Sequence, residues 1–228
     1  MLVLYFVYKI QSRPVIEYTD LSQPIYKRLK EMIRSGELKQ GEKIIQEKIA
    51  ETLGVSRTPL MKALLALENE YLVESIPRRG MYIRALNHQE IIDIYICREA
   101  LEGMAARLLA TKKSNATVKK LEACFSSFIG ENNINEAVYA QADEAFHSLL
   151  IQLTGNKPLD TIYFFSNIHD KVVGHGLVRS PKETLKEHFN IIRAIESGDA
   201  DKAEQLTRAH INKSKELLIN QYKNQERE

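Results

Sequence analysis

A run of six residues from Gly54 to Pro59 constrains the local fold more than any other segment of this chain. Gly54 adopts the left-handed backbone of a tight turn at little cost. Ser56 is a candidate N-cap, because its side-chain oxygen can accept a hydrogen bond from an amide two or three residues further on. Pro59 falls in the first turn of the helix that follows, where a missing N–H group costs little. The run therefore predicts a tight turn between two helices, with Arg57 and Thr58 at the start of the second.

The segments on either side of this turn complete a recognisable pattern. Apolar residues recur at helical spacing over 24–35, and a second helix is expected over 46–53. The third helix is expected from Ser56 to about Glu70. Two strand-like runs then follow, separated by a turn at Pro77-Arg78-Arg79-Gly80. Three helices followed by a hairpin with a basic tip predict a winged helix-turn-helix.

After residue 86 the pattern changes to helices alone. Gly155-Asn156 and Ser197-Gly198-Asp199 are clear stops between helices. The expected helices lie at 88–110, 115–129, 134–154, 158–175, 181–197 and 200–225. We therefore predict a mainly α fold, in which a winged helix-turn-helix precedes a bundle of about six helices. The expected divisions are an N-terminal extension at 1–21, a winged domain at 22–85 and a helical, dimerising domain at 86–228.

Charge and cysteine usage narrow the class of protein. Residues 24–84 carry twelve Lys/Arg and eight Asp/Glu, whereas residues 85–228 carry eighteen and twenty. This basic front segment favours a nucleic-acid-binding module. The two cysteines form no Cys-x-x-Cys pair, which fits a reducing compartment. The apolar stretch from Met1 to Tyr8 is too short to span a bilayer, and it lacks the basic n-region and the small-residue cleavage site of a signal peptide. We expect a cytoplasmic protein with no membrane partner.

In helix-turn-helix proteins the start of the second helix faces base edges and phosphates, so we expect double-stranded DNA as a partner. The candidate DNA-binding residues are Ser56, Arg57, Thr58, Lys62, Arg78, Arg79 and Gly80. The first three begin the recognition helix, and the lysine is a weaker phosphate candidate. The last three form the tip of the wing, where arginines suit phosphates or the minor groove. The alternative is an ordinary helix start and a solvated turn, without DNA contact.

Four residues in the second half have the chemistry of a metal site. Asp143 and His147 are four apart on an expected helix, so they project from one face. His188 and His210 lie on two later helices, next to apolar residues that suggest inward faces. Mixed imidazole and carboxylate ligands suit zinc, nickel, manganese or iron. The alternative is a set of buried histidines that donate to backbone carbonyls and hold no metal.

The whole arrangement resembles the GntR family of bacterial transcription regulators, in the branch whose C-terminal part is the all-helical FCD ligand-binding domain. The resemblance covers roughly residues 22–220, and the count of about six helices is closer to the VanR-like subgroup than to the FadR-like one. In the N-terminal half it rests on Gly36-Glu37-Leu38-Lys39-Gln40-Gly41, Ile49-Ala50, Leu53 to Pro59, Ala63-Leu64, Leu67-Glu68 and Gly80. In the C-terminal half it rests on Arg98 with Glu102, Asp143-x-x-Phe146-His147, Glu187-His188 and His210. The resemblance implies a metal at the same Asp and three His positions.

One position departs from the family pattern. The family usually follows the proline with a small apolar residue and then Arg-Glu, whereas this chain has Leu60, Met61 and Lys62. A methionine cannot form the paired hydrogen bonds that an arginine makes with guanine or phosphate. We therefore do not expect this chain to bind the operator sequences that are typical of the family.

The function that we expect is a ligand-responsive transcription regulator, which binds an inverted-repeat operator as a homodimer. A small organic carboxylate is the expected effector, held at the metal. Arg98 and Asn167 are the candidate effector-binding residues, with His169 as a further one. Arg98 has the alternative of a structural ion pair with Glu102. Two other functions stay open, a regulator that senses the metal itself and a metalloenzyme. Repression is the expected sign of regulation, although the sequence does not fix it.

Overall fold

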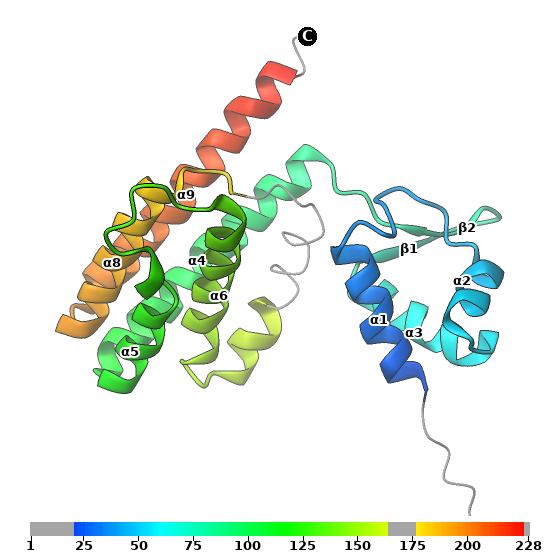
Figure 1. Ribbon diagram of the computed structural model, residues 1–228, viewed down its shortest axis with the longest axis horizontal. Coiled ribbons are helices and arrows are strands. Elements are labelled where there is room, and N and C mark those ends of the chain that lie inside the picture. Colours follow the sequence, from blue (N-terminus) through cyan, green and yellow to red (C-terminus); the bar gives the residue numbers. More distant parts are fainter. Residues whose placement is uncertain (1–20, 164–176, 226–228) are drawn as a thin grey trace, which may run out of the picture.

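The computed structural model describes residues 21–163 and 177–225 and is mainly helical, with a two-stranded sheet in the first half (Figure 1). The winged part and the helical part are joined through residues 84–87. The predicted fold class is confirmed. The elements are α1 Ser22–Arg34, α2 Gln46–Leu53, α3 Arg57–Asn69, β1 Val73–Ile76, β2 Gly80–Ile83, α4 His88–Lys112, α5 Asn115–Ala123, the 3-10 turn η1 Ser126–Phe128, α6 Glu136–Gln152, α8 Pro181–Ser197 and α9 Ala200–Gln225.

The turn between α2 and α3 has the backbone that the sequence predicts. Gly54 ends α2 in the left-handed region, with φ 63° and ψ 35°. Ser56 has the extended backbone of an N-cap residue. The expected capping bond is wrong, because within the described part of the chain the Ser56 side chain accepts no hydrogen bond from the first turn of α3. Ser56 is exposed, so water can satisfy the first amides of this helix.

The winged part is built around apolar side chains from its three helices and its hairpin. Leu29 of α1 and Leu60 and Leu67 of α3 are fully buried in this core. The hairpin is antiparallel, with Val73 opposite Ile83. The segment before α2 adds to the outer edge of β2, because the Ile44 amide donates to the Met81 carbonyl at 2.8 Å. The wing is therefore held from both sides and not only by its own turn.

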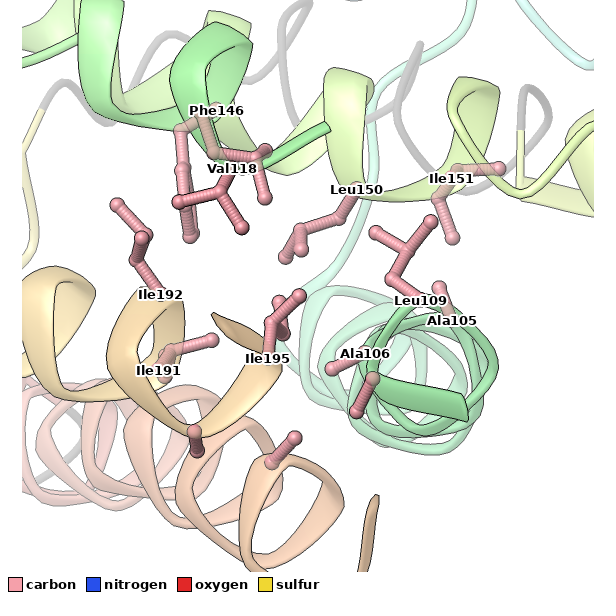
Figure 2. Packing of buried hydrophobic residues seen from close by; sticks show 14 of the residues in the cluster. Ala105, Ala106, Leu109, Val118, Phe146, Leu150, Ile151, Ile191, Ile192 and Ile195 are labelled. Atoms are coloured by element: carbon pink, nitrogen blue, oxygen red, sulfur yellow. The ribbon is translucent and has the colours of Figure 1, made fainter. Parts of the chain in front are cut away.

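The helical part is organised around α4 and α9, which form its most extensive helix pair. Asn87 and Glu90 form a capping box that starts α4 directly after the wing. Gly103 allows α4 and α9 to approach closely, since a Cβ atom at this position would lie 2.6 Å from Cγ of Arg208. The second half of α4 faces the main core, where Ala105, Ala106 and Leu109 meet Phe146 and Leu150 of α6 and Ile191, Ile192 and Ile195 of α8 (Figure 2).

One expected helix is clearly shorter in the structure, and another is described only in part. The helix expected over 115–129 ends at Ala123, and the chain continues through η1 to Gly130 with a positive φ. Residues 157–163 are helical, as expected for the segment 158–175, and the rest of that segment lies outside the described residues. Among the described helices, none has the length and apolar character that crossing a membrane requires.

Candidate metal centre and nucleic-acid interface

The structure brings the four metal candidates together from three helices. Asp143 and His147 lie on α6, His188 on α8 and His210 on α9, and one ligand atom from each falls within 4.8 Å of the others. The Asp143 carboxylate lies 3.6 Å from Nε2 of His147 and 3.4 Å from Nε2 of His188. The three imidazoles are buried, whereas Asp143 is partly exposed. A cation at this point would meet three ring nitrogens and a carboxylate.

The opposite nitrogen of each ring contacts a second polar side chain. Such contacts fix the orientation and the tautomer of a ligating histidine. The three Nδ1 contacts are His147 with Glu102, His188 with Tyr139 Oη at 3.2 Å and His210 with Glu187 Oε2 at 2.8 Å. Nε2 of His188 is buried and finds no hydrogen-bond partner among the described residues. An orphaned nitrogen that points at a carboxylate is the arrangement that a metal would satisfy.

Burial sets the protonation of two of these rings. It lowers the pKa of His188 well below the ordinary value, and the charges of His210 and His147 lower it further. Burial also lowers the pKa of His210, although its hydrogen bond with Glu187 acts in the opposite direction. A neutral imidazole has the free lone pair that metal ligation needs.

Glu102 is a fully buried carboxylate at the centre of a charged network. Burial alone would raise its pKa, but the charges and hydrogen bonds of His147 and Arg98 outweigh burial and hold it at about 2. Glu102 in turn raises the pKa of His147 against the effect of burial. Tyr163 also donates to Glu102, over 3.2 Å. The ionised carboxylate therefore fixes the His147 ring from behind.

A cavity of about 60 Å³ opens beside the cluster. By the roughly 10–15 Å³ that one water position needs, it has room for about four to six. The lining residues are Tyr95, Arg98, Asp143, His147, Leu177, Val178, Arg179, Thr184, His210, Ile211 and Ser214. Two arginines and three metal candidates thus border one small space.

Arg98 forms the ion pair that was one of its two alternatives, and its position leaves the other alternative, effector binding, open. Its Nε donates to Glu102 over 2.9 Å, and the residue also lines the cavity. Its guanidinium lies 5.0 Å from the ring centroid of Tyr95. The ion pair and the cavity position are therefore compatible. The other effector candidates, Asn167 and His169, lie outside the described residues.

Two residues of the site were missed by the sequence analysis. Arg179 is 1% exposed and donates to both carboxylate oxygens of Glu187, at 2.7 and 2.8 Å, and to the His210 carbonyl at 3.3 Å. It precedes α8 in a segment without helical period, so no pattern marked it. Tyr139 lies four residues before Asp143 on α6, and that spacing was a signal that could have been used.

The DNA candidates of α3 are accessible at its first turn. Arg57, Thr58 and Lys62 are exposed, and Arg57 forms an ion pair with the exposed Glu47 of α2 at 2.8 Å. Met61 is partly buried against the core of the winged part. Its side chain therefore packs against that core, at the position where the family usually has an arginine.

The tip of the wing has an unusual backbone. The Arg79 amide donates to the Ile76 carbonyl over 3.0 Å, which closes a turn with Pro77 at its first corner. Arg78 occupies the second corner with φ 64°, and Gly80 follows with φ 102°. A positive φ is costly for arginine, so the turn has a strained residue at its second corner. Arg78, Arg79 and Gly80 are all exposed.

A winged helix-turn-helix is the architecture of a class of DNA-binding proteins, and here it is joined to a helical bundle. Comparisons with known proteins identify the family within this class. Residues 21–83 match the bacterial regulatory proteins of the gntR family, and residues 93–213 match the FCD domain. The chain therefore belongs to the GntR family and carries an FCD domain.

Its relatives and structural neighbours agree with this assignment. The uncharacterised HTH-type transcriptional regulator YdhC of Bacillus subtilis is 28% identical over 200 residues, which cover 85% of this chain and 88% of the relative. The HTH-type transcriptional repressor RspR of Escherichia coli is 24% identical over 204 residues, which cover 87% of this chain and 89% of the relative. A GntR regulator structure from Rhodococcus sp. RHA1 shares the fold, with a TM-score of 0.69 at 20% identity over 89% of this chain and 99% of that one. The chain is a transcriptional regulator and not an enzyme, which excludes the metalloenzyme alternative.

Proposed function

We propose that this regulator binds an inverted-repeat operator as a homodimer, and that a small organic acid held at a metal in the helical domain changes its affinity for DNA. The observation that carries the proposal is the cavity beside Asp143, His147 and His210, which also reaches Arg98. A metal with room beside it and a nearby guanidinium suit an anionic ligand.

The residues present fit a divalent cation. Asp143, His147, His188 and His210 would hold it, and the orphaned Nε2 of His188 supports this assignment. The donor set is compatible with zinc, nickel, manganese or iron. When bound, the metal supplies a positive centre with open positions for carboxylate oxygens. Glu102, Tyr139 and Glu187 orient the three rings from behind, so the site needs little rearrangement on binding.

The effector is proposed to be a small carboxylate, because the described cavity has room for only a few non-hydrogen atoms. Arg98 is proposed as its second anchor, since a guanidinium matches a carboxylate in shape. The hydrogen bond from Arg98 to Glu102 holds that guanidinium at the cavity wall. Asn167 stays a proposed effector residue without structural support.

In the DNA-bound state we assign base-edge contacts to Arg57 and Thr58, and phosphate contacts to Ser56 and Lys62. Their exposure at or near the start of α3 supports this assignment. Arg78, Arg79 and Gly80 are proposed to follow the adjacent groove or backbone. The pair between Arg57 and Glu47 is exposed and so costs little to break on binding.

Effector binding is proposed to change DNA affinity through the relative placement of two winged domains, with a coupling free energy of about 1–3 kcal/mol. We place the domain limits at 22–85 and 86–228, and the protein in the cytoplasm. Repression is the proposed sign of regulation, in line with the name of the relative RspR.

A gel shift with the promoter region of its own gene at low salt tests the proposal. The protein is first freed of metal and then titrated separately with zinc, with nickel and with a panel of small carboxylates. We expect the carboxylate response to require metal. If metal alone gives the whole response, the protein is a metal sensor. Failure to retard the DNA under every condition would contradict the proposed operator.

A further inference from the structure

Helix α9 continues past the metal centre and reaches the start of α4. Arg107, near the end of α4, pairs with Glu204 near the start of α9. His88, the first residue of α4, meets Tyr222 near the end of α9. The two helices therefore lie side by side in opposite directions (Figure 1). At 1.5 Å per residue, Tyr222 is about 18 Å beyond His210 along the helix axis, next to the linker between the two domains.

The contact at this point is a stack of two aromatic rings. The ring centroids of His88 and Tyr222 are 3.8 Å apart, and the ring planes differ by 4°. Tyr222 is 6% exposed, although it lies only three residues before the end of α9 at Gln225. The last turn of a helix normally frays unless tertiary contacts hold it. A buried tyrosine in that turn indicates that the end of α9 is held against α4.

A small apolar cluster extends from this stack to the cavity. Ile91 and Leu218 are buried in the cluster, and Leu86 of the linker packs against it. Tyr95 and Ile211 belong to the same cluster and also line the cavity beside the metal centre. Closely packed side chains transmit small displacements to their neighbours. The cavity and the linker are therefore connected through one set of packed side chains.

The linker is anchored to the winged part as well. The Arg84 amide donates to the Leu72 carbonyl over 3.0 Å, and the Arg84 guanidinium lies 5.4 Å from the ring centroid of Tyr71. The same guanidinium pairs with Glu90 in the first turn of α4. Leu86 lies between these anchors. A displacement of Leu86 therefore changes how the winged part is placed on the helical part.

We propose that residues 214–225 of α9 form a strap, which holds the linker through Tyr222 and couples the occupancy of the metal centre to the winged part. The nature of the coupled signal rests on the proposed function. His210 and Tyr222 lie on one continuous helix, so a cation that fixes His210 also fixes where Tyr222 meets His88. Removing the cation loosens α9, and the linker gains conformational freedom.

The strap is a feature of this chain and not of the matched domains. His88 lies between the segments 21–83 and 93–213 that match the two family models, and residues 214–225 lie beyond the second. Neither partner of the stack therefore belongs to a matched segment.

Hydrogen exchange of the linker tests the strap, with zinc as the probe. Mass spectrometry follows the peptides that cover residues 84–92 in the metal-free and the zinc-loaded protein. We expect zinc to slow exchange in the wild type. His88→Ala should speed exchange by roughly 2–10-fold, because an aromatic contact is lost, and should remove most of the zinc effect. This variant leaves the core intact, since His88 is exposed. Tyr222→Ala should act at least as strongly.

Two matched variants serve as controls. Leu217→Ala changes a neighbouring side chain of the strap that is 40% exposed, and we expect it to exchange as the wild type does. His88→Phe keeps an aromatic ring against Tyr222, so it should retain the zinc effect that His88→Ala loses.

Zinc affinity, measured by isothermal titration, separates the strap from the metal centre. Coupling is reciprocal, so His88→Ala and Tyr222→Ala should weaken zinc binding by no more than the factor by which zinc slows linker exchange in the wild type. A zinc effect on the linker that persists undiminished in both variants would overturn the strap and leave the metal centre intact. Zinc binding without any effect on the wild-type linker would do the same. A wild-type protein that binds no zinc would overturn both proposals.

Discussion

At the scale of single residues, the histidine cluster is organised by what lies behind each ring. One nitrogen of each of His147, His188 and His210 belongs to the cluster with Asp143, and Glu102, Tyr139 and Glu187 contact the other. Buried histidines without a ligand role would turn both nitrogens toward protein partners, because an unmet polar group costs about 1–3 kcal/mol. Nε2 of His188 has no hydrogen-bond partner in the described chain. The alternative of ordinary core histidines therefore leaves this atom without an explanation.

Replacing Asp143 tests the metal site directly. We expect Asp143→Ala to weaken zinc binding by more than the roughly 10–100-fold that loss of an outer partner typically costs, because it removes the one charged ligand. Glu144→Ala is the matched control, since that carboxylate is adjacent in sequence but outside the cluster. Isothermal titration of the metal-free proteins measures both. Equal affinities in the two variants would rule out Asp143 as a ligand.

The start of α3 offers a second test at this scale. Arg57→Ala should weaken operator binding by about 1–3 kcal/mol if Arg57 contacts a base. If Arg57 contacts a phosphate, the substitution should instead reduce the slope of log binding constant against log salt concentration by about one. Its lost ion pair with Glu47 is exposed and contributes little to folding. Arg193→Ala, an exposed arginine of α8, is the control. Titrating fluorescent operator DNA at several salt concentrations separates the two contacts; unchanged affinity would remove Arg57 from the interface.

Some residues of the metal site and of the turn could be predicted from the sequence, and others could not, for physical reasons. Asp143 and His147 were found because helical spacing places them on one face, and Gly54 because a turn needs its backbone. Arg179 was missed because its role depends on α8 and α9 meeting in space, which no local pattern records. The Ser56 cap was wrong because capping depends on local geometry and solvent, and not on residue type alone.

At the scale of elements, the sequence predicted helix ends correctly where a proline or a glycine restricts or permits a particular backbone conformation. α8 and α9 have the predicted bounds, since Pro181 starts one and Gly198, with φ 75°, separates them. The helix after Asn115 was predicted too long, because its end is set by packing. Phe125, fully buried against Tyr139 and Phe146, leaves the helical path to enter the core.

The α4–α9 pair depends on Gly103. Gly103→Ala should destabilise the chain, because overpacking against Arg208 costs about 1–3 kcal/mol while alanine gains only about 1 kcal/mol of helix propensity. In an Arg208→Ala background the obstruction is absent, so the same change should stabilise. Urea unfolding of the four proteins measures both signs. If Gly103→Ala has the same sign in the two backgrounds, the close approach of the helices is not the reason for this glycine.

At the scale of the whole molecule, the candidate metal centre lies where the main helices of the second half meet. Its ligands come from α6, α8 and α9, and Glu102 extends the network to α4. α4 also follows the wing directly. A cation bound at this point would therefore join three helices that pack on α4, and α4 is a route by which it could affect the winged part.

Removing the metal should accordingly lower the stability of the helical part far more than that of the winged part. Metal at 1,000 times its dissociation constant adds about 4 kcal/mol, and each kcal/mol shifts the midpoint of a domain of this size by roughly 2–4 °C. We therefore expect a chelator to lower the calorimetric transition of the helical part by roughly 8–16 °C in the zinc-loaded protein. It should shift the transition of the Asp143→Ala variant far less, because that variant binds the metal more weakly. A wild-type transition that does not respond to the chelator would contradict a metal that bridges these helices.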